Sequence, residues 1–168
     1  MANTYTLIAS STVGAGGAAN IDFTSIPSTY TDLVLKLSAR NSGAQYYGQL
    51  YFNGSTTGYS RRLLYGDGSS TGSLAASNEY TLVTNPTTSY TASTFGNFEI
   101  YIPNYAGSTN KSYSIDAVIE NNATTAYATM YAALWSNTAA INRITMVPNS
   151  PDTFVQYSTA YLYGIKNS

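Results

Sequence analysis

The nine residues Asp32–Arg40, DLVLKLSAR, decide the fold class of this 168-residue chain. Leu33, Leu35 and Leu37 recur with a period of two and alternate with residues such as Lys36. Because successive side chains of a strand point to opposite faces, this pattern predicts a β-strand with one buried face.

The same period recurs along the chain. Asn97–Ile102 and Tyr113–Glu120 alternate in the same way, and the turn-forming stretch Pro103–Ser108 between them predicts that the two strands are neighbours. Further strands are expected at Tyr5–Val13, Asn20–Phe23, Tyr46–Asn53, Ser60–Tyr65, Ala126–Trp135, Ile141–Val147 and Ser158–Ile165. About ten short strands in one chain predict a single all-β domain over residues 1–168, a sandwich or a barrel. Only Thr71–Tyr80 leaves a short helix or a loop open.

The glycine-rich stretch Val13–Pro27, VGAGGAANIDFTSIP, contains the letters of a dinucleotide-binding fingerprint. That motif holds a pyrophosphate at a helix N-terminus, and no helix can start here because Ile21 and Phe23 alternate and Pro27 follows closely. We therefore expect a glycine loop that joins two strands, and no nucleotide cofactor.

Charge is scarce in this chain. Charged residues make up 9% of it and the net charge is −1, whereas 59 residues are Ser, Thr or Asn. Binding to nucleic acid or to an anionic membrane needs clustered Lys and Arg, so neither partner is expected. The N-terminus, MANTYTLIAS, has no basic segment followed by an apolar one, which indicates synthesis in the cytoplasm without a signal peptide.

The chain has no His and no Cys, which excludes the usual nucleophile–base pairs and ordinary zinc sites. Glycoside hydrolysis can proceed on two carboxylates alone. Asp116 and Glu120 share one face of a predicted strand, and Glu99 can oppose them, but strand alternation already explains all three as a solvated face. We therefore expect no enzyme, no catalytic residues and no cofactor.

The segment Tyr65–Gly72, YGDGSSTG, resembles the start of a calcium loop but lacks the acid at its twelfth position, where Asn78 stands. A glycine-rich hairpin loop is the preferred interpretation, and no metal site is expected. Just before it, Arg61 and Arg62 should face opposite sides of a strand, so at most one of them serves a given surface; partner contact and simple solvation remain open for both.

The chain is unusually rich in tyrosine, with 17 residues, and this is the feature of its composition that says most about binding. Tyr combines a large contact area with a polar tip and is common in binding surfaces, including those that stack on sugars, although it also suits the exposed face of a strand. If they cluster on one exposed face, the candidate residues for partner binding are Tyr46, Tyr47, Arg61, Arg62 and Tyr65.

Three segments carry a resemblance to a known family: NIDFTSIPSTYTDLVLKLSAR (20–40), LLYGDGSS (63–70) and INRITMVPNSPDTFVQYSTAYLYGIK (141–166). They resemble small virion structural proteins of tailed bacteriophages, particularly those that infect marine cyanobacteria. The resemblance implies a β-sandwich of jelly-roll type on the outside of a capsid or on the tail, assembled as a trimer or another symmetric oligomer. It carries no active-site residues to positions of this chain.

The leading functional hypothesis is a capsid decoration (cement) protein that binds the outside of the major-capsid lattice and stabilises the head. The absence of heptads or fibrous repeats favours it over a fibre shaft. The alternative is a tail-associated or head-fibre protein that binds a host surface glycan through loops rich in Tyr, Asn, Ser and Thr. A polysaccharide depolymerase, the third possibility, needs a carboxylate pair that the sequence does not place.

Overall fold

The computed structural model describes residues 4–44, 47–77, 81–84, 86–122 and 126–166, with the backbone alone for 81–84. The described residues form twelve strands and no helix, so the expected all-β class is confirmed. The strands are β1 (Tyr5–Thr12), β2 (Ile21–Phe23), β3 (Asp32–Ala39), β4 (Tyr47–Phe52), β5 (Tyr59–Gly66), β6 (Thr71–Ser77), β7 (Thr81–Thr84), β8 (Gly96–Ile102), β9 (Lys111–Ile119), β10 (Tyr127–Trp135), β11 (Ile144–Pro148) and β12 (Thr159–Ile165). No helix in this part of the chain has the length and apolar character needed to cross a bilayer.

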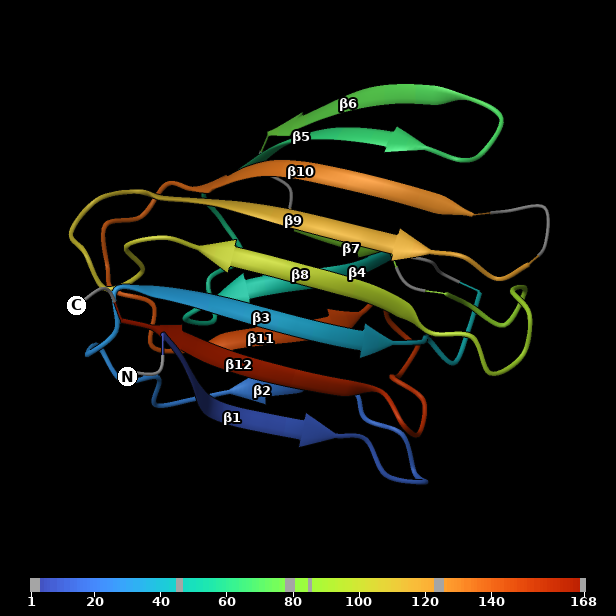
Figure 1. Cartoon of the computed structure of the whole chain (residues 1–168), viewed down its shortest axis with the longest axis horizontal. Helices are drawn as coiled ribbons and strands as arrows, with labels where there is room; N and C mark the ends of the chain where they lie inside the picture. The colour runs from blue at the N-terminus through green and yellow to red at the C-terminus, as the bar shows by residue number, and fades with distance from the viewer. Residues whose placement is uncertain (1–3, 45–46, 78–80, 85, 123–125, 167–168) are drawn as a thin grey trace.

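The strands form two antiparallel sheets packed as a sandwich (Figure 1). The larger sheet has eight strands in the order β1-β12-β3-β8-β9-β10-β5-β6, and the smaller has four in the order β2-β11-β4-β7. Eight of the strands pair in a nested way, as β1 with β12, β2 with β11, β3 with β8 and β4 with β7. A long antiparallel hairpin rolled into two sheets gives this pairing, so the fold is a jelly roll.

Two insertions enlarge one side of the jelly roll. β5 and β6 follow β4, β9 and β10 follow β8, and all four strands join the larger sheet beside β8. The larger sheet therefore extends past the smaller one, and β5 and β6 lie at its free end (Figure 1). Leu74 on the inner face of β6 is 54% exposed, which confirms that the smaller sheet does not cover this end.

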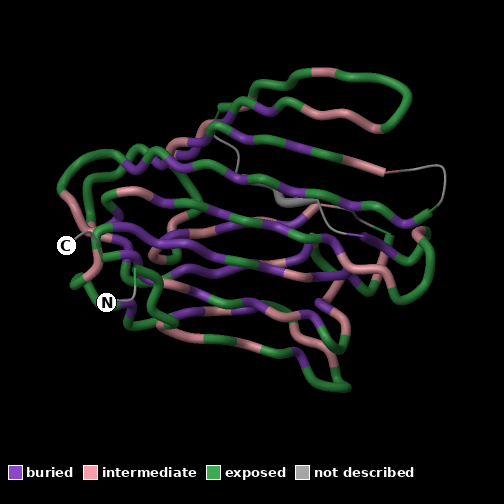
Figure 2. The backbone as a smooth tube through the Cα atoms, viewed as in Figure 1, coloured by how far each residue is buried: buried purple, intermediate pink, exposed green. Residues whose placement is uncertain are grey.

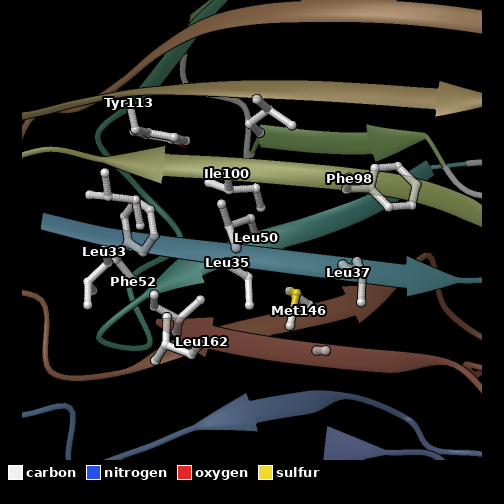
Figure 3. Packing of buried hydrophobic residues seen from close by; sticks show 14 of the residues in the cluster. Leu33, Leu35, Leu37, Leu50, Phe52, Phe98, Ile100, Tyr113, Met146 and Leu162 are labelled. Atoms are coloured by element: carbon white, nitrogen blue, oxygen red, sulfur yellow. The ribbon is translucent and has the colours of Figure 1, made fainter. Parts of the chain in front are cut away.

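The core lies between the two sheets and follows the predicted period of two. Buried and exposed residues alternate along the whole of β8 and β9 (Figure 2). Leu35 of β3 and Ile100 of β8 face Leu50 of β4 and Met146 of β11 across the sandwich (Figure 3). Burial of such side chains contributes about 1.5–3 kcal/mol each, which makes this layer the main source of stability.

Residues 71–77 correct one expectation. The sequence left a helical turn or a loop open at Thr71–Tyr80, but Thr71–Ser77 is strand β6, paired along its full length with β5. The segment TGSLAAS has no clear period of its own, and pairing with a neighbour decides its conformation. The β5–β6 connection is the expected hairpin loop at Asp67. Residues 13–20 of the glycine-rich stretch join β1 to β2, as expected, and β2 itself lies within the rest of that stretch.

An ion pair fixes β2 to β11 in the smaller sheet. Arg143 Nε and Nη2 donate to both carboxylate oxygens of Asp22 at 2.8–3.1 Å, and the Thr145 hydroxyl adds a bond of 2.7 Å. The hydrogen bonds from Arg143 are the main reason that the pKa of Asp22 lies below its ordinary value of 3.8.

This geometry predicts an acid-dependent loss of stability. A carboxyl group with a lowered folded-state pKa stabilises the protein above its unfolded pKa, and this contribution disappears as the pH falls through the folded value. We expect Asp22→Asn to be less stable than the parent at pH 7 and the difference to shrink below pH 3.8, as measured by urea unfolding at several pH values. Asp116→Asn, on an exposed position of β9, is the matched control. A difference that stays constant with pH would contradict this expectation.

Candidate functional site

The β5 strand sends its two adjacent arginines to opposite faces, as the sequence predicts. Arg61 lies on the inner face with Leu63 and is 8% exposed, whereas Arg62 lies on the outer face and is exposed. The guanidinium carbon of Arg61 lies 5.8 Å from the ring centroid of Tyr131 on the neighbouring strand β10. An Arg over an aromatic face is attracted by the ring quadrupole, so Tyr131 helps to hold Arg61 in place.

The position of the Tyr65 ring depends on the absence of a side chain at Gly72. Tyr65 pairs with Gly72 across the β5–β6 hairpin, and its ring lies directly over that residue. A Cβ atom built at Gly72 would lie 2.6 Å from the hydroxyl oxygen of Tyr65, closer than any normal contact. Any side chain at position 72 must therefore displace the Tyr65 ring.

These side chains meet in a cavity of about 240 Å³ on the inner face of β5, β6 and β10, which we call the tyrosine pocket. Four tyrosines and two charged residues line it: Tyr47, Tyr65, Tyr127, Tyr131, Arg61 and Asp67. Leu63 and the exposed Leu74 add an apolar surface. The pocket therefore combines flat aromatic faces with a few groups able to form directional hydrogen bonds.

Asp67 supplies a fixed negative charge at this pocket. Its carboxylate accepts hydrogen bonds from the backbone N–H groups of Ser69 and Ser70 at 2.9 and 2.6 Å, and from their hydroxyls at 3.0 and 2.8 Å. These four bonds hold the pKa of Asp67 well below its usual range, with the backbone donors contributing most. Asp67 is therefore ionised at any ordinary pH, and its charge is opposite to that of Arg61.

The structure brings together three of the five residues predicted for partner binding. Tyr47, Arg61 and Tyr65 line the tyrosine pocket, Arg62 points to the other face of the sheet, and Tyr46 lies outside the described residues. The five therefore do not gather on one exposed face, because a strand that carries Arg61 inward must carry Arg62 outward.

Sequence reasoning missed Tyr127, Tyr131 and Asp67 as pocket residues. Tyr127 and Tyr131 share a face of the predicted strand Ala126–Trp135, and Asp67 stands in the loop considered for calcium. The local sequence therefore contained a reason to consider each of them as a site residue. What was missing was the pairing of β10 with β5, which places Tyr131 opposite Leu63.

A second surface feature lies on the outer face of the same strands. Leu64, Met130 and Val118 are 62%, 63% and 48% exposed. On one side Met130 pairs with Leu64 of β5. On the other side it pairs with Asp116 of β9, and Val118 follows two residues later on the same face. The three apolar side chains therefore form one patch over β5, β10 and β9. The sheet is hollowed here, with a volume of about 630 Å³. We call Leu64, Val118 and Met130 the outer apolar patch.

The carboxylates considered for catalysis occupy the solvated face that strand alternation predicts. Glu99, Asp116 and Glu120 are exposed, Glu99 lies opposite Asp116, and the Glu99 carboxylate forms an ion pair of 2.7 Å with Lys36. Within the described residues, no group of three or more acidic, His or Cys side chains is arranged to hold a metal ion.

Comparison with known proteins adds no relative. No protein-family model matches the chain, and neither the curated proteins nor the solved structures give a match. The resemblance to phage virion proteins stays a prediction.

Proposed function

We propose that this protein is a structural protein of a tailed-bacteriophage virion, and that it decorates the capsid by binding the outside of the assembled major-capsid lattice. In this role it assembles with copies of itself, as a trimer or another symmetric oligomer, and stabilises the head by binding only the assembled state. The jelly-roll fold is compatible with this role, since viral capsid proteins often have it, but fold alone does not imply function.

The observation that carries the proposal is the outer apolar patch. Large apolar side chains exposed next to one another on a sheet face are typical of interaction surfaces. Leu64 and Met130 are each more than 60% exposed on adjacent strands, and the charged Asp116 and Arg62 lie beside them on the same face. An apolar centre with polar and charged residues at its rim is the composition found in protein interfaces.

A cryo-electron microscopy reconstruction of the particle that carries this chain tests the proposal. We expect twelve-stranded jelly-roll density repeated over the capsid lattice, with the outer face of β5, β10 and β9 against a neighbouring subunit. Density confined to the tail or to projecting fibres would support the alternative virion location, a tail-associated or head-fibre protein. Purified particles without the chain, as judged by mass spectrometry, would overturn the virion role.

The double variant Leu64→Lys/Met130→Lys is expected to bind stripped particles at least about tenfold more weakly in a co-sedimentation assay. It removes two apolar contacts and replaces them with two charged side chains, which must lose water if they are to be buried in the interface. Because both positions are exposed, the melting temperature should change by no more than about 2 °C. Ser112→Lys, at an exposed position on the outer face of β9 but outside the patch, is the matched control. Unchanged binding of the double variant would show that docking uses another surface.

A further inference from the structure

The tyrosine pocket is a separate feature from the outer apolar patch, because the two lie on opposite faces of β5 and β10. Leu63 faces the pocket and Leu64 faces the patch, as neighbours on a strand must. A role for the pocket is therefore independent of the docking role proposed above. It also stays open to solvent when the outer face is covered, since the smaller sheet does not extend over Leu74.

The walls of the pocket define the chemistry of a ligand. Tyr65 from β5, Tyr127 from β10 and Tyr47 from β4 offer flat apolar rings with polar tips, whereas Tyr131 is buried and supports Arg61. Arg61 provides N–H donors, and Asp67 provides an acceptor at Oδ2, which accepts a single hydrogen bond from Ser70, whereas Oδ1 already accepts three. A sugar ring has complementary chemistry. Its faces carry C–H groups that pack on aromatic rings, and the hydroxyls around its edge both donate and accept hydrogen bonds.

The size and charge of the pocket further restrict the class of ligand that it can bind. Its volume of about 240 Å³ lies below the range of roughly 300–1,000 Å³ that is usual for drug-sized ligands, which limits the occupant to about one ring. The fixed carboxylate of Asp67 repels an anion, and the opposite charge of Arg61 leaves the lining without a net charge. Both points favour an uncharged ring over a sialic acid or a phosphorylated sugar.

Three side chains of the pocket are held in place without a ligand. The Tyr65 ring lies over Gly72, the Arg61 guanidinium lies over Tyr131, and four hydrogen bonds fix Asp67. A preformed site loses little conformational entropy on binding, which allows even a small ligand to bind measurably. We propose that the tyrosine pocket binds one uncharged sugar ring, as a terminal or branch residue of a glycan.

The test uses the methyl glycosides of glucose, galactose, mannose and N-acetylglucosamine as probes. Saturation-transfer NMR should detect at least one of them, and titration should give an affinity in the millimolar range or better. Tyr65→Ala should weaken that affinity about tenfold, since it removes a stacking face. Tyr161→Ala, which removes an equally large ring from the outer face of β12, is the matched control and should leave the affinity unchanged.

Gly72→Ala provides a second variant that retains every tyrosine. It should weaken binding as Tyr65→Ala does, because the new methyl group displaces the Tyr65 ring. Fluorescence of Trp135, which is buried in the core, reports whether each variant is folded. No saturation transfer to any probe, full affinity in folded Tyr65→Ala, an equal loss in Tyr161→Ala, or tighter binding of N-acetylneuraminic acid than of the neutral glycosides would each overturn the proposal.

Discussion

Replacing Phe52 with alanine is expected to lower the free energy of unfolding by about 3–5 kcal/mol. Phe52 is fully buried and comes from β4 of the smaller sheet. Its ring packs against three rings from the larger sheet, with centroid distances of 5.1 Å to Tyr113, 5.6 Å to Trp135 and 6.1 Å to Tyr59. Removing it opens a cavity at the point where the two sheets meet, and three aromatic neighbours lose contacts together.

Urea unfolding followed by Trp135 fluorescence measures this effect directly. Trp135 is the single tryptophan of the chain, is 1% exposed and stacks on Tyr59, so its emission reports on this part of the core. Tyr161→Ala, an exposed aromatic truncation, should change the unfolding free energy by only about 0.5 kcal/mol. A loss below about 1 kcal/mol for Phe52→Ala would mean that the sheets do not meet through this ring.

Lys111→Met is expected to be the second most damaging change, with a loss of about 2–4 kcal/mol. Lys111 begins β9 and is 1% exposed, and its ammonium group donates to the carbonyl oxygens of Gly107, Thr109 and Thr138. It thereby ties the loop before β9 to the segment after β10. Met has a similar length but cannot donate, so these carbonyl oxygens lose a buried partner.

The pH dependence separates this contribution from simple packing. Burial lowers the pKa of Lys111 below its ordinary value of 10.5, so in the alkaline range the unfolded chain binds the proton more tightly than the folded one. Stability from this group therefore rises as the pH increases toward 10.5, and the advantage of the parent over Lys111→Met should widen there. Lys36→Met, which removes an exposed ion pair with Glu99, is the matched control and should cost at most about 1 kcal/mol. Equal stability of Lys111→Met and the parent would contradict the assigned role.

The strands that the sequence predicts well are those with one buried and one solvated face. β8 and β9 alternate cleanly, because burial on one side selects apolar residues at every second position. β6 gave no such pattern, since it extends past the smaller sheet and has no fully covered face. The nested pairing that makes the fold a jelly roll connects residues far apart in the chain, and only the family resemblance pointed to it.

Polar residues at strand ends also depart from the alternation. The pattern places Asp32 and Arg40 on the polar face with Lys36, yet both are buried. The Tyr101 hydroxyl and the Asn104 N–H donate to Asp32, and Arg40 donates to the carbonyl oxygens of Tyr90, Thr91 and Thr94. A charged group can be buried when such partners satisfy it. Apart from Tyr101 of β8, these partners come from loops that a periodicity argument does not place.

The candidate site was predictable only in part for the same reason. Strand parity alone separates Arg61 from Arg62, and this expectation is confirmed. Which tyrosines join Arg61 depends on the register between β5 and β10, where Tyr131 lies opposite Leu63. The sequence does not fix the register between two strands that are so distant in the chain. A shift of the register by one residue would turn every tyrosine of β10 to the other face of the sheet.

The nested pairing also has a consequence for how the chain reaches its structure. The innermost pair, β4 with β7, joins segments close in sequence, whereas the outermost pair aligns Tyr5 with Ile165, near opposite ends of the chain. Loop-closure entropy rises with the length of chain enclosed, so the roll should assemble from the inside outward and β1 should dock last. Such non-local contacts place folding in the millisecond-to-second range, and β1, as the last strand to dock, should be the first to exchange its amide hydrogens.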